Sequence, residues 1–327
     1  MKEEILKNLL ESDGYISGEE LSMQLGVSRA AVWKAVKQLE SESYVIEASP
    51  RKGYRLISSP DVLTQEEIGH YLKTGYMGRR IIYLESVNST NDEVKRQAAK
   101  GAGEGLVILA EEQLSGRGRK GRGWITVKDE SIAASILLKP DISPEKALSI
   151  TPVLALSIVQ GLEKEAGIKT GIKWPNDIVL ENKKLCGILT EMNAEIDRIN
   201  YIVVGMGMNV NQACLPEDIG NIATSLRIHS GKSFSRKRIM ACILNCFEEN
   251  YEVYKRNGLK PMVPMLKEYS VLLGRHIKLV SPDSIREGTA LDMDEQGALI
   301  VRLDSGEITR VISGDVSVRG LYEIPQV

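Results

Sequence analysis

Apolar residues recur at helical spacing through the first forty positions of the chain. Ile5 and Leu9 repeat on one face of a first helix. Ser17 and Ser28 are each followed by a further stretch of this kind, and serine is a preferred helix N-cap. Gly26 lies between these two stretches and can end the first of them in a left-handed conformation. Two helices joined by a short glycine-containing turn predict a helix-turn-helix.

The next segment changes from helical to strand-like patterning. Residues 44–57, YVIEASPRKGYRLI, predict two short strands around a turn at 50–53. Three helices followed by a hairpin resemble a winged helix-turn-helix domain. We therefore predict such a domain over residues 1–60.

Helical and strand patterns alternate from residue 61 to about residue 270. Strands are predicted near 81–86, 106–112, 131–138, 178–180, 184–193 and 201–210, with helices over 91–101 and 144–167. This order predicts a mixed α/β domain of the α+β class over 61–270. Residues 271–327 alternate apolar and polar positions with turn residues between them, which predicts a small all-β barrel of the SH3-like type.

Composition narrows the possible classes of protein. The chain has 327 residues and a net charge of −2, which suits two or three globular domains and disfavours a protein that binds nucleic acid over its whole surface. No apolar run approaches the roughly 20 residues of a membrane-spanning helix. The first ten residues are charged and amphipathic, unlike a secretory signal. We expect a cytoplasmic protein with no membrane partner.

The charge of the first module is unevenly distributed. Residues 1–63 contain eight Lys or Arg and ten Asp or Glu, so the module is not basic overall. Basic residues nevertheless gather on its second predicted helix-turn-helix helix and on its wing, where they can meet DNA phosphates. The predicted DNA-binding residues are Ser28, Arg29, Ala30, Lys34, Lys37, Arg51 and Lys52. The alternative is a protein-interaction module with solvated charges.

Residues 113–124, QLSGRGRKGRGW, are the most informative stretch. Glycines allow the backbone N–H groups to approach a ligand, and arginines supply fixed positive charge for phosphate or carboxylate. This combination predicts an anion-binding loop. It is not a Walker A loop, because Arg122-Gly123 follows Gly121 in place of Lys-Ser/Thr. An RNA-binding arginine-glycine tail is the alternative, but such tails lie in disordered regions and this stretch lies between two apolar strands.

A second stretch, KWPNDI at 173–178, precedes a lysine pair and KLCGIL at 184–189. Lys184 follows Asp177 by seven residues and begins a strand that enters the core. Burying an ammonium group there costs free energy, so its presence suggests that the charge has a function. Taken alone, Lys183 and Lys184 favour a solvated hairpin turn.

These motifs together carry a family resemblance. GRGRKGRGW, KWPNDI with KLCGIL, and Ser89-Thr90-Asn91 resemble biotin protein ligase, and the added DNA-binding module resembles the bifunctional kind that is also the biotin operon repressor. The resemblance covers essentially the whole chain. It implies a central catalytic domain of the class II synthetase-like biotin ligase type.

The resemblance also implies a role for individual residues. Biotin would be bound by Ser89, Thr90, Asn91, Gln113, Gly116, Arg117, Gly118, Arg119 and Lys184. ATP or the adenylate would be bound by Arg119, Arg122, Trp124, Asn176, Asp177, Asn209 and Arg319. The catalytic residues would be Lys184, Arg117 and Arg119. For Asn209, the alternative is a plain strand, because GMGMN lacks the third glycine of a dinucleotide fingerprint. For Arg319, it is a solvated arginine at a strand end.

The implied reaction is a carbon–nitrogen ligation with ATP and biotin as substrates and Mg²⁺ as cofactor. Biotinyl-5'-AMP would form first, and its biotinyl group would pass to a lysine of a biotin carboxyl carrier protein. The same adenylate would favour a homodimer that binds operator DNA of biotin synthesis or uptake genes. The alternatives are a ligand-sensing transcription factor without turnover and a lipoate ligase. The sequence does not identify the Mg²⁺ ligands.

Overall fold

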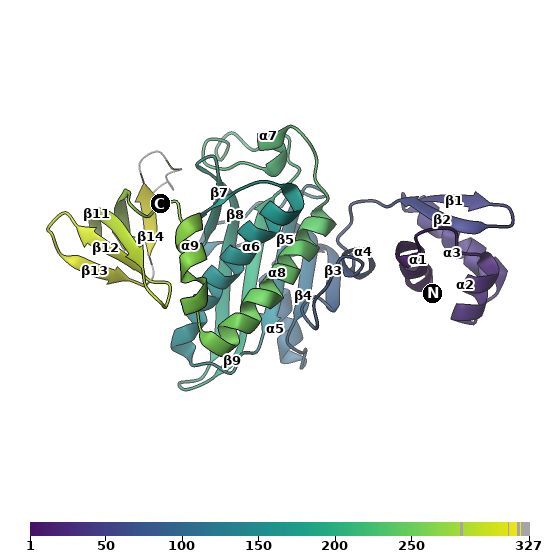
Figure 1. The fold of residues 1–327 in the computed structure, drawn as a ribbon, viewed down its shortest axis with the longest axis horizontal. Helices are drawn as coiled ribbons and strands as arrows, with labels where there is room; N and C mark the ends of the chain where they lie inside the picture. Colours follow the sequence, from purple (N-terminus) through teal and green to yellow (C-terminus); the bar gives the residue numbers. More distant parts are fainter. Residues whose placement is uncertain (282–283, 313, 319–320, 322–327) are drawn as a thin grey trace.

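The computed structural model describes residues 1–327 apart from 282–283, 313, 319–320 and 322–327. The chain passes through three regions in order (Figure 1). Three helices and a hairpin lie at one end of the molecule, a large sheet with covering helices forms the middle, and a smaller sheet lies at the other end. The predicted fold class is confirmed.

The amino-terminal region is a helix-turn-helix with a two-stranded wing. Its elements are α1 (Lys2–Glu11), α2 (Gly18–Leu25), α3 (Arg29–Ser41), β1 (Val45–Ser49) and β2 (Gly53–Ser58). The Ser17 and Ser28 side chains accept hydrogen bonds from the N–H groups of Glu20 and Ala31, as N-caps do. Gly26 ends α2 with φ of 64°. The predicted caps and helix end are therefore in place.

Gly53 fixes the position of the wing. It has φ of 106°, and a Cβ there would lie 2.1 Å from the Ile16 carbonyl oxygen. The neighbouring Tyr54 exchanges two backbone hydrogen bonds with Ile16, each of 2.9 Å. Only glycine permits this close approach of two chains, so the wing is held against the segment that precedes α2.

The middle region is built on a seven-stranded sheet in the order β3-β4-β5-β9-β8-β7-β6. Among these strands only β3 and β4 pair in parallel, and the helix α5 (Thr90–Ala99) connects them. The strands are β3 (Arg80–Val87), β4 (Leu106–Gln113), β5 (Ser131–Leu138), β6 (Gly171–Lys173), β7 (Asp177–Leu180), β8 (Lys183–Ala194) and β9 (Ile199–Asn209). All eight residues of β5 are buried, as expected of a central strand covered on both faces.

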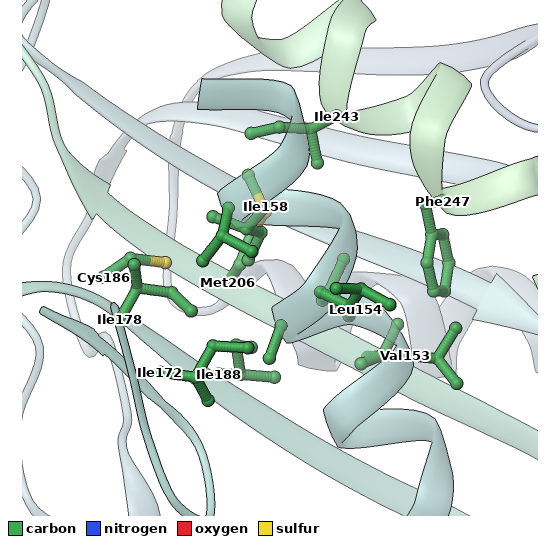
Figure 2. Close-up of a cluster of buried hydrophobic side chains, with 14 of the residues drawn as sticks. Val153, Leu154, Ile158, Ile172, Ile178, Cys186, Ile188, Met206, Ile243 and Phe247 are labelled. Atoms are coloured by element: carbon green, nitrogen blue, oxygen red, sulfur yellow. The ribbon is translucent and has the colours of Figure 1, made fainter. Parts of the chain in front are cut away.

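Two long helices, α6 (Ile150–Ala166) and α8 (Arg236–Asn257), pack side by side on one face of this sheet (Figure 1). Leu154 and Ile158 of α6 meet Ile188 and Met206 of the sheet in the main core (Figure 2). Successive residues of a strand face opposite sides, so Val203 joins a separate small core beneath α5.

One helix is shorter than predicted. The expected helix over 144–167 is a 3₁₀ segment at Pro144–Ser149 followed by α6. Pro152 has no N–H and is tolerated only in the first turn of an α-helix, which explains a start at Ile150. The remaining helical elements of the middle region are short: α4 (Gln65–Gly69), α7 (Leu226–Ser230), α9 (Val263–Tyr269) and the 3₁₀ turns Arg119–Gly121 and Lys260–Met262.

The carboxy-terminal region is an antiparallel sheet in the order β13-β12-β11-β10-β14. Its strands are β10 (His276–Ser281), β11 (Ser284–Met293), β12 (Leu299–Leu303), β13 (Ile308–Val311) and β14 (Asp315–Val318). It is fastened to the middle region near Gly297, whose carbonyl accepts a 3.0 Å hydrogen bond from the Trp174 indole. Within the described residues, no helix has the length and apolar character needed to traverse a lipid bilayer.

Candidate active site

A cavity of about 470 Å³ opens over β8 and β9 of the large sheet. Its walls come from four parts of the chain: the start of α5, the arginine-glycine loop, the KWPND turn with the start of β8, and the loop at 218–223. The lining residues are Ser89, Thr90, Asn91, Gln113, Arg117, Gly118, Arg119, Arg122, Gly123, Trp124, Ile125, Asn176, Asp177, Lys184, Gly187, Ile188, Leu189, Gly205, Met206, Gly207, Asn209, Asp218, Ile219, Ile222 and Ala223.

Glycines of β8 and β9 open the floor of this cavity. A Cβ at Gly207 would lie 2.3 Å from the Trp124 indole, and one at Gly205 would lie 2.2 Å from Asn91 Oδ1. Gly187 is in the same situation, with Lys184 and Trp124 each within 3.3 Å. A flat aromatic group can therefore rest directly on the strand backbone.

One end of the cavity carries a fixed set of hydrogen-bonding groups. Gln113 Oε1 accepts from the Thr90 N–H at 3.0 Å and from the Thr90 hydroxyl at 3.1 Å. Buried Ser135 donates to Thr90 Oγ1 at 2.7 Å and lies 2.6 Å from Asn91 Oδ1. These bonds hold both donors and acceptors at defined positions, as recognition of a small polar ring requires.

Asn91 is also tied to a charged pair behind it. Its amide donates to Glu191 at 2.7 Å, and Lys95 forms an ion pair with the same carboxylate at 2.7 Å. Burial favours protonation of Glu191, but the hydrogen bonds from Lys95 and Asn91 outweigh burial and lower its pKa. The carboxylate therefore stays ionised and orients Asn91.

Lys184 enters the cavity from the start of β8. Its Nζ lies 2.7 Å from Asp177 Oδ1 and 5.6 Å from the centre of the Trp124 ring. The lysine side chain is 26% exposed and the aspartate 8%. Glu181 and Asn182 form the preceding turn with positive φ, so Lys183 and Lys184 already belong to the strand. Asp177 holds the ammonium group at the cavity wall, which differs from the solvated hairpin turn considered above.

The arginine-glycine loop folds back on itself. Gly118 N–H donates to the Arg122 carbonyl at 2.7 Å, and Trp124 N–H donates to the Gly116 carbonyl at 2.8 Å. Arg117 forms an ion pair with Asp92. Arg119 donates to Asn176 Oδ1 at 3.1 Å, in the KWPND turn. The loop thus brings guanidinium groups toward Lys184.

Arg119 also reaches the carboxy-terminal region. Its Nη1 lies 3.2 Å from the Gly314 carbonyl oxygen, to which it donates. The loop is therefore held between the middle sheet and the smaller sheet.

A family assignment follows from comparison with known proteins. Family models match residues 83–209 (Biotin/lipoate A/B protein ligase family), 2–55 (HTH domain) and 272–319 (Biotin protein ligase C terminal domain). The chain is 38% identical to the bifunctional ligase/repressor BirA of Bacillus subtilis over 325 residues, covering 97% of this chain and 100% of that protein. The Escherichia coli BirA is 28% identical, with 95% of each chain covered.

The chain belongs to the BirA family of bifunctional ligase/repressors. A solved structure supports the biotin-ligase part of this assignment. Biotin protein ligase from Aquifex aeolicus, in complex with biotin and ATP, is 30% identical with a TM-score of 0.65, covering 74% of this chain and 99% of that one.

Nearly all of the residues predicted for the BirA-type site line the one cavity. Gly116 is the exception among those described: it lies at the base of the loop, where a Cβ would meet the Trp124 carbonyl oxygen at 2.4 Å. Arg319 lies outside the described residues. Asn209 belongs to β9 and also lines the cavity, with its amide donating to the Thr224 carbonyl at 3.1 Å.

The sequence reasoning missed one wall of this cavity. Ile219, Ile222 and Ala223 come from a loop without a motif. The loop is attached to Lys184, because the Lys184 N–H donates to the Ile222 carbonyl at 2.8 Å and the Lys184 carbonyl accepts from the Thr224 N–H at 2.9 Å. The sequence signal that could have indicated this wall is the presence of apolar residues in a stretch that forms neither helix nor strand.

The predicted DNA-binding residues of this BirA relative lie on the surface. Arg29, Lys34 and Lys37 project from the exposed side of α3, opposite its buried Val32, Val36 and Leu39. Arg51 and Lys52 are exposed at the tip of the wing. Trp33, which the sequence reasoning missed, stands on α3 with its side chain 55% exposed.

Proposed function

We propose that this chain converts biotin and ATP into biotinyl-5'-AMP and pyrophosphate and then transfers biotin to a lysine of a biotin carboxyl carrier protein. The observation that carries the proposal is a cavity in which the hydrogen-bonded group around Thr90 and Gln113, the guanidinium groups of the loop and the Lys184 ammonium group meet. The family membership supports it, as do the biotin and ATP held by the Aquifex aeolicus relative.

The first step joins two anions that repel each other. A biotin carboxylate oxygen attacks the α-phosphorus of ATP, and pyrophosphate leaves with the electrons of the broken P–O bond. Arg117, Arg119 and Lys184 supply positive charge at the cavity wall, and such charge stabilises the crowded transition state. Ser89, Thr90 and Gln113 orient the biotin ring so that its carboxylate points toward these cations.

The second step is an acyl transfer. The neutral amine of the carrier lysine attacks the carbonyl carbon of biotinyl-5'-AMP, and an amide bond forms as the bond between that carbon and the phosphate oxygen breaks. AMP leaves with the electrons of the broken bond, and the proton of the attacking amine passes to solvent. A loop anchored at both ends can keep water away from the mixed anhydride until the carrier arrives. Arg122, Trp124, Asn176 and Asn209 would hold the adenylate, with Trp124 leaving the glycine floor to close over it.

The cavity also suits a magnesium ion. Asp218 offers carboxylate oxygens along its wall, whereas Asp177 is paired with Lys184, and Mg²⁺ in nucleotide sites is held by one or two carboxylates together with phosphates. When bound, the ion would neutralise phosphate charge.

We further propose that the adenylate is a corepressor. Binding of biotin and ATP would favour a homodimer that places two α3 helices on the half-sites of an operator, with Ser28, Arg29, Ala30, Lys34, Lys37, Arg51 and Lys52 contacting DNA. Trp33 extends the list, since an exposed aromatic among these cations can contact base edges. A cytoplasmic location follows, because ATP, carrier and chromosome are there.

One assay tests the enzymatic half. The chain is incubated with ATP, biotin and a purified biotin carboxyl carrier domain, and the carrier is analysed by mass spectrometry. We expect one biotinylated lysine. A parallel reaction with lipoate should leave the carrier unmodified; lipoylation in place of biotinylation would reject biotin as the substrate.

A second assay tests the regulatory half. DNA selected from a random pool by the full chain with biotin and ATP serves as the operator probe. Its affinity should rise on addition of biotin and ATP, and fall when Arg29 and Lys34 are both replaced by alanine. Equal affinity in all of these conditions would reject repression.

A further inference from the structure

Residues 59–61, here called the linker, join the winged module to the catalytic region and are held by buried charges. Lys237, in the first turn of α8, donates to the Ser59 hydroxyl at 2.5 Å, to the Pro60 carbonyl at 2.9 Å and to Glu67 Oε2 at 2.5 Å. Glu67 has no exposed surface, and Lys237 is 5% exposed. When an ion pair is removed from water in this way, its attraction offsets the cost of desolvation only if the two charges meet in good geometry.

A residue of the winged module touches the same charges. The Tyr44 side chain is buried and lies beside the Glu67 carboxylate; burial first, and then that carboxylate, raise the pKa of Tyr44. Helix α1 of the module also packs on α4, which carries Glu67. The module therefore contacts the catalytic region through more than the linker.

Arg236 fixes the other end of the linker. Its guanidinium donates to the Asp61 carbonyl at 2.5 Å and to Asp61 Oδ2 at 3.2 Å. The backbone N–H groups of Arg236 and Lys237 donate to the Asp61 carboxylate at 3.0 and 3.2 Å. The last linker residue is thus bound to the first turn of α8.

The same guanidinium extends into the large sheet. Arg236, 1% exposed, donates to Glu111 of β4 at 2.6 Å and to the Ser131 carbonyl of β5 at 3.0 Å. Ser131 in turn accepts from Gln212, which donates to Asn209 in the cavity wall at 3.3 Å. The linker and the adenylate cavity are consequently attached to one hydrogen-bonded framework.

Domains joined by a short linker move relative to one another unless their interface prevents it. Apolar residues of similar volume can stabilise an interface as well as a buried ion pair, whereas a buried ion pair is compensated only when its two charges meet in good geometry. Asp61, Glu67, Arg236 and Lys237 are here called the interdomain joint.

We propose that the interdomain joint, with Tyr44 against it, holds the winged module in one orientation on the catalytic region. Its residues are positioning residues and not part of the reaction. In a dimer, this orientation sets the separation of the two α3 helices and therefore the spacing of operator half-sites, a consequence that rests on the proposed repressor function.

Two variants of the full chain test this proposal. Glu67→Gln removes the charge that faces Lys237 and keeps the shape of the side chain, and Tyr44→Phe removes only the hydroxyl. Tyr54→Phe is the matched control, because Tyr54 lies in the same module and packs against Ile16 and Gly18. Backbone ¹⁵N relaxation gives separate rotational correlation times for residues 1–58 and for the large sheet.

The parent chain and Tyr54→Phe should show one common correlation time. Glu67→Gln, and to a smaller extent Tyr44→Phe, should show a shorter time for the winged module alone. Biotin-dependent pyrophosphate release should stay within about twofold of the parent. A common correlation time in both variants, or loss of the module's amide dispersion in Tyr44→Phe, would overturn the proposal.

DNA binding gives the second readout. We expect affinity for the selected two-half-site DNA to fall about tenfold in Glu67→Gln, while affinity for one half-site is unchanged. An equal loss on both DNAs would show damage to the DNA-binding surface instead and would overturn the spacing role. If the parent itself binds neither DNA, the repressor function fails, and the relaxation measurement still decides whether the joint is rigid.

Discussion

Lys183 and Lys184 are adjacent in sequence, but their side chains have different surroundings. Lys184 faces Asp177 inside the cavity, whereas Lys183 donates to the Gly220 carbonyl at 2.8 Å on the other side of the strand. Successive strand residues face opposite sides, so the lysine pair presents only one ammonium group to the substrates. The family resemblance pointed to Lys184 by its distance from Asp177 and the KLCGIL that follows, and Lys184 does line the cavity. The opposed directions of the two side chains follow from the turn at 181–182.

Lys184→Ala should slow biotin-dependent pyrophosphate release by about a hundredfold or more, because a positioned charge that stabilises the transition state is lost. Lys183→Ala is the matched control and should retain most of the activity. Circular dichroism would establish that both variants fold. Similar rates for the two variants would reject the catalytic role of Lys184.

Gly207 gives a second test at the residue scale. Gly207→Ala places a Cβ where the Trp124 indole now lies and narrows the floor of the cavity. We expect the KM for biotin to rise about tenfold or more, since overpacking costs roughly 1–3 kcal/mol, with little change in the KM for ATP. An unaltered biotin KM would mean that this floor does not contact biotin.

At the scale of elements, patterns with local causes were predictable. The caps of α2 and α3, the wing and most central strands follow from residues close in sequence. The start of α8 does not, because the partners of its buried Arg236 and Lys237 lie 105 to 178 residues away in the sequence. The wall at 219–223 was also missed, since a loop is placed by hydrogen bonds to distant strands. The domain limits at residues 60 and 270 stay predictions.

Helix α8 carries a tyrosine that links stability to pH. Burial raises the pKa of Tyr254 to about 12, and its hydroxyl donates to the Lys146 carbonyl at 2.7 Å. In the unfolded chain the pKa is about 10. A raised folded-state pKa means that the contribution is complete below pH 10 and is lost as the pH rises toward 12.

The free energy of unfolding should therefore fall between pH 10 and 12, by at most about 1.4 kcal/mol per pH unit from this one group. Urea unfolding of the parent and of Tyr254→Phe across this range measures the effect. The variant should lose stability less steeply with pH. Parallel curves would contradict the assigned burial of the hydroxyl.

The arginine-glycine loop contacts both the middle region and the carboxy-terminal region. Arg119 bonds both the KWPND turn and Gly314 of the carboxy-terminal region, so Arg119→Ala should speed release of biotinyl-5'-AMP without the carrier. Lys120→Ala is the matched control, because Lys120 is in the same loop but does not line the cavity. Release, followed with radiolabelled adenylate, should be unchanged in the control. Equal release rates from the two variants would show that Arg119 does not retain the adenylate.

At the scale of the whole molecule, contacts join the three regions of the chain to one another. The linker that follows the winged module is bound to the first turn of α8, the large sheet provides the cavity, and the carboxy-terminal region contacts Arg119 of the arginine-glycine loop. The motifs made this assembly recognisable from sequence as a family. The contacts between regions were not predictable, because they join residues that share no local pattern.

The central claim is that this cavity makes two anions react, and does not merely bind them. Biotin-dependent exchange of radiolabelled pyrophosphate into ATP measures that step alone, without carrier or DNA. We predict exchange that requires biotin and is lost in Lys184→Ala but not in Lys183→Ala. A chain that binds biotin and ATP yet shows no exchange would be a ligand sensor, and that result would contradict the account.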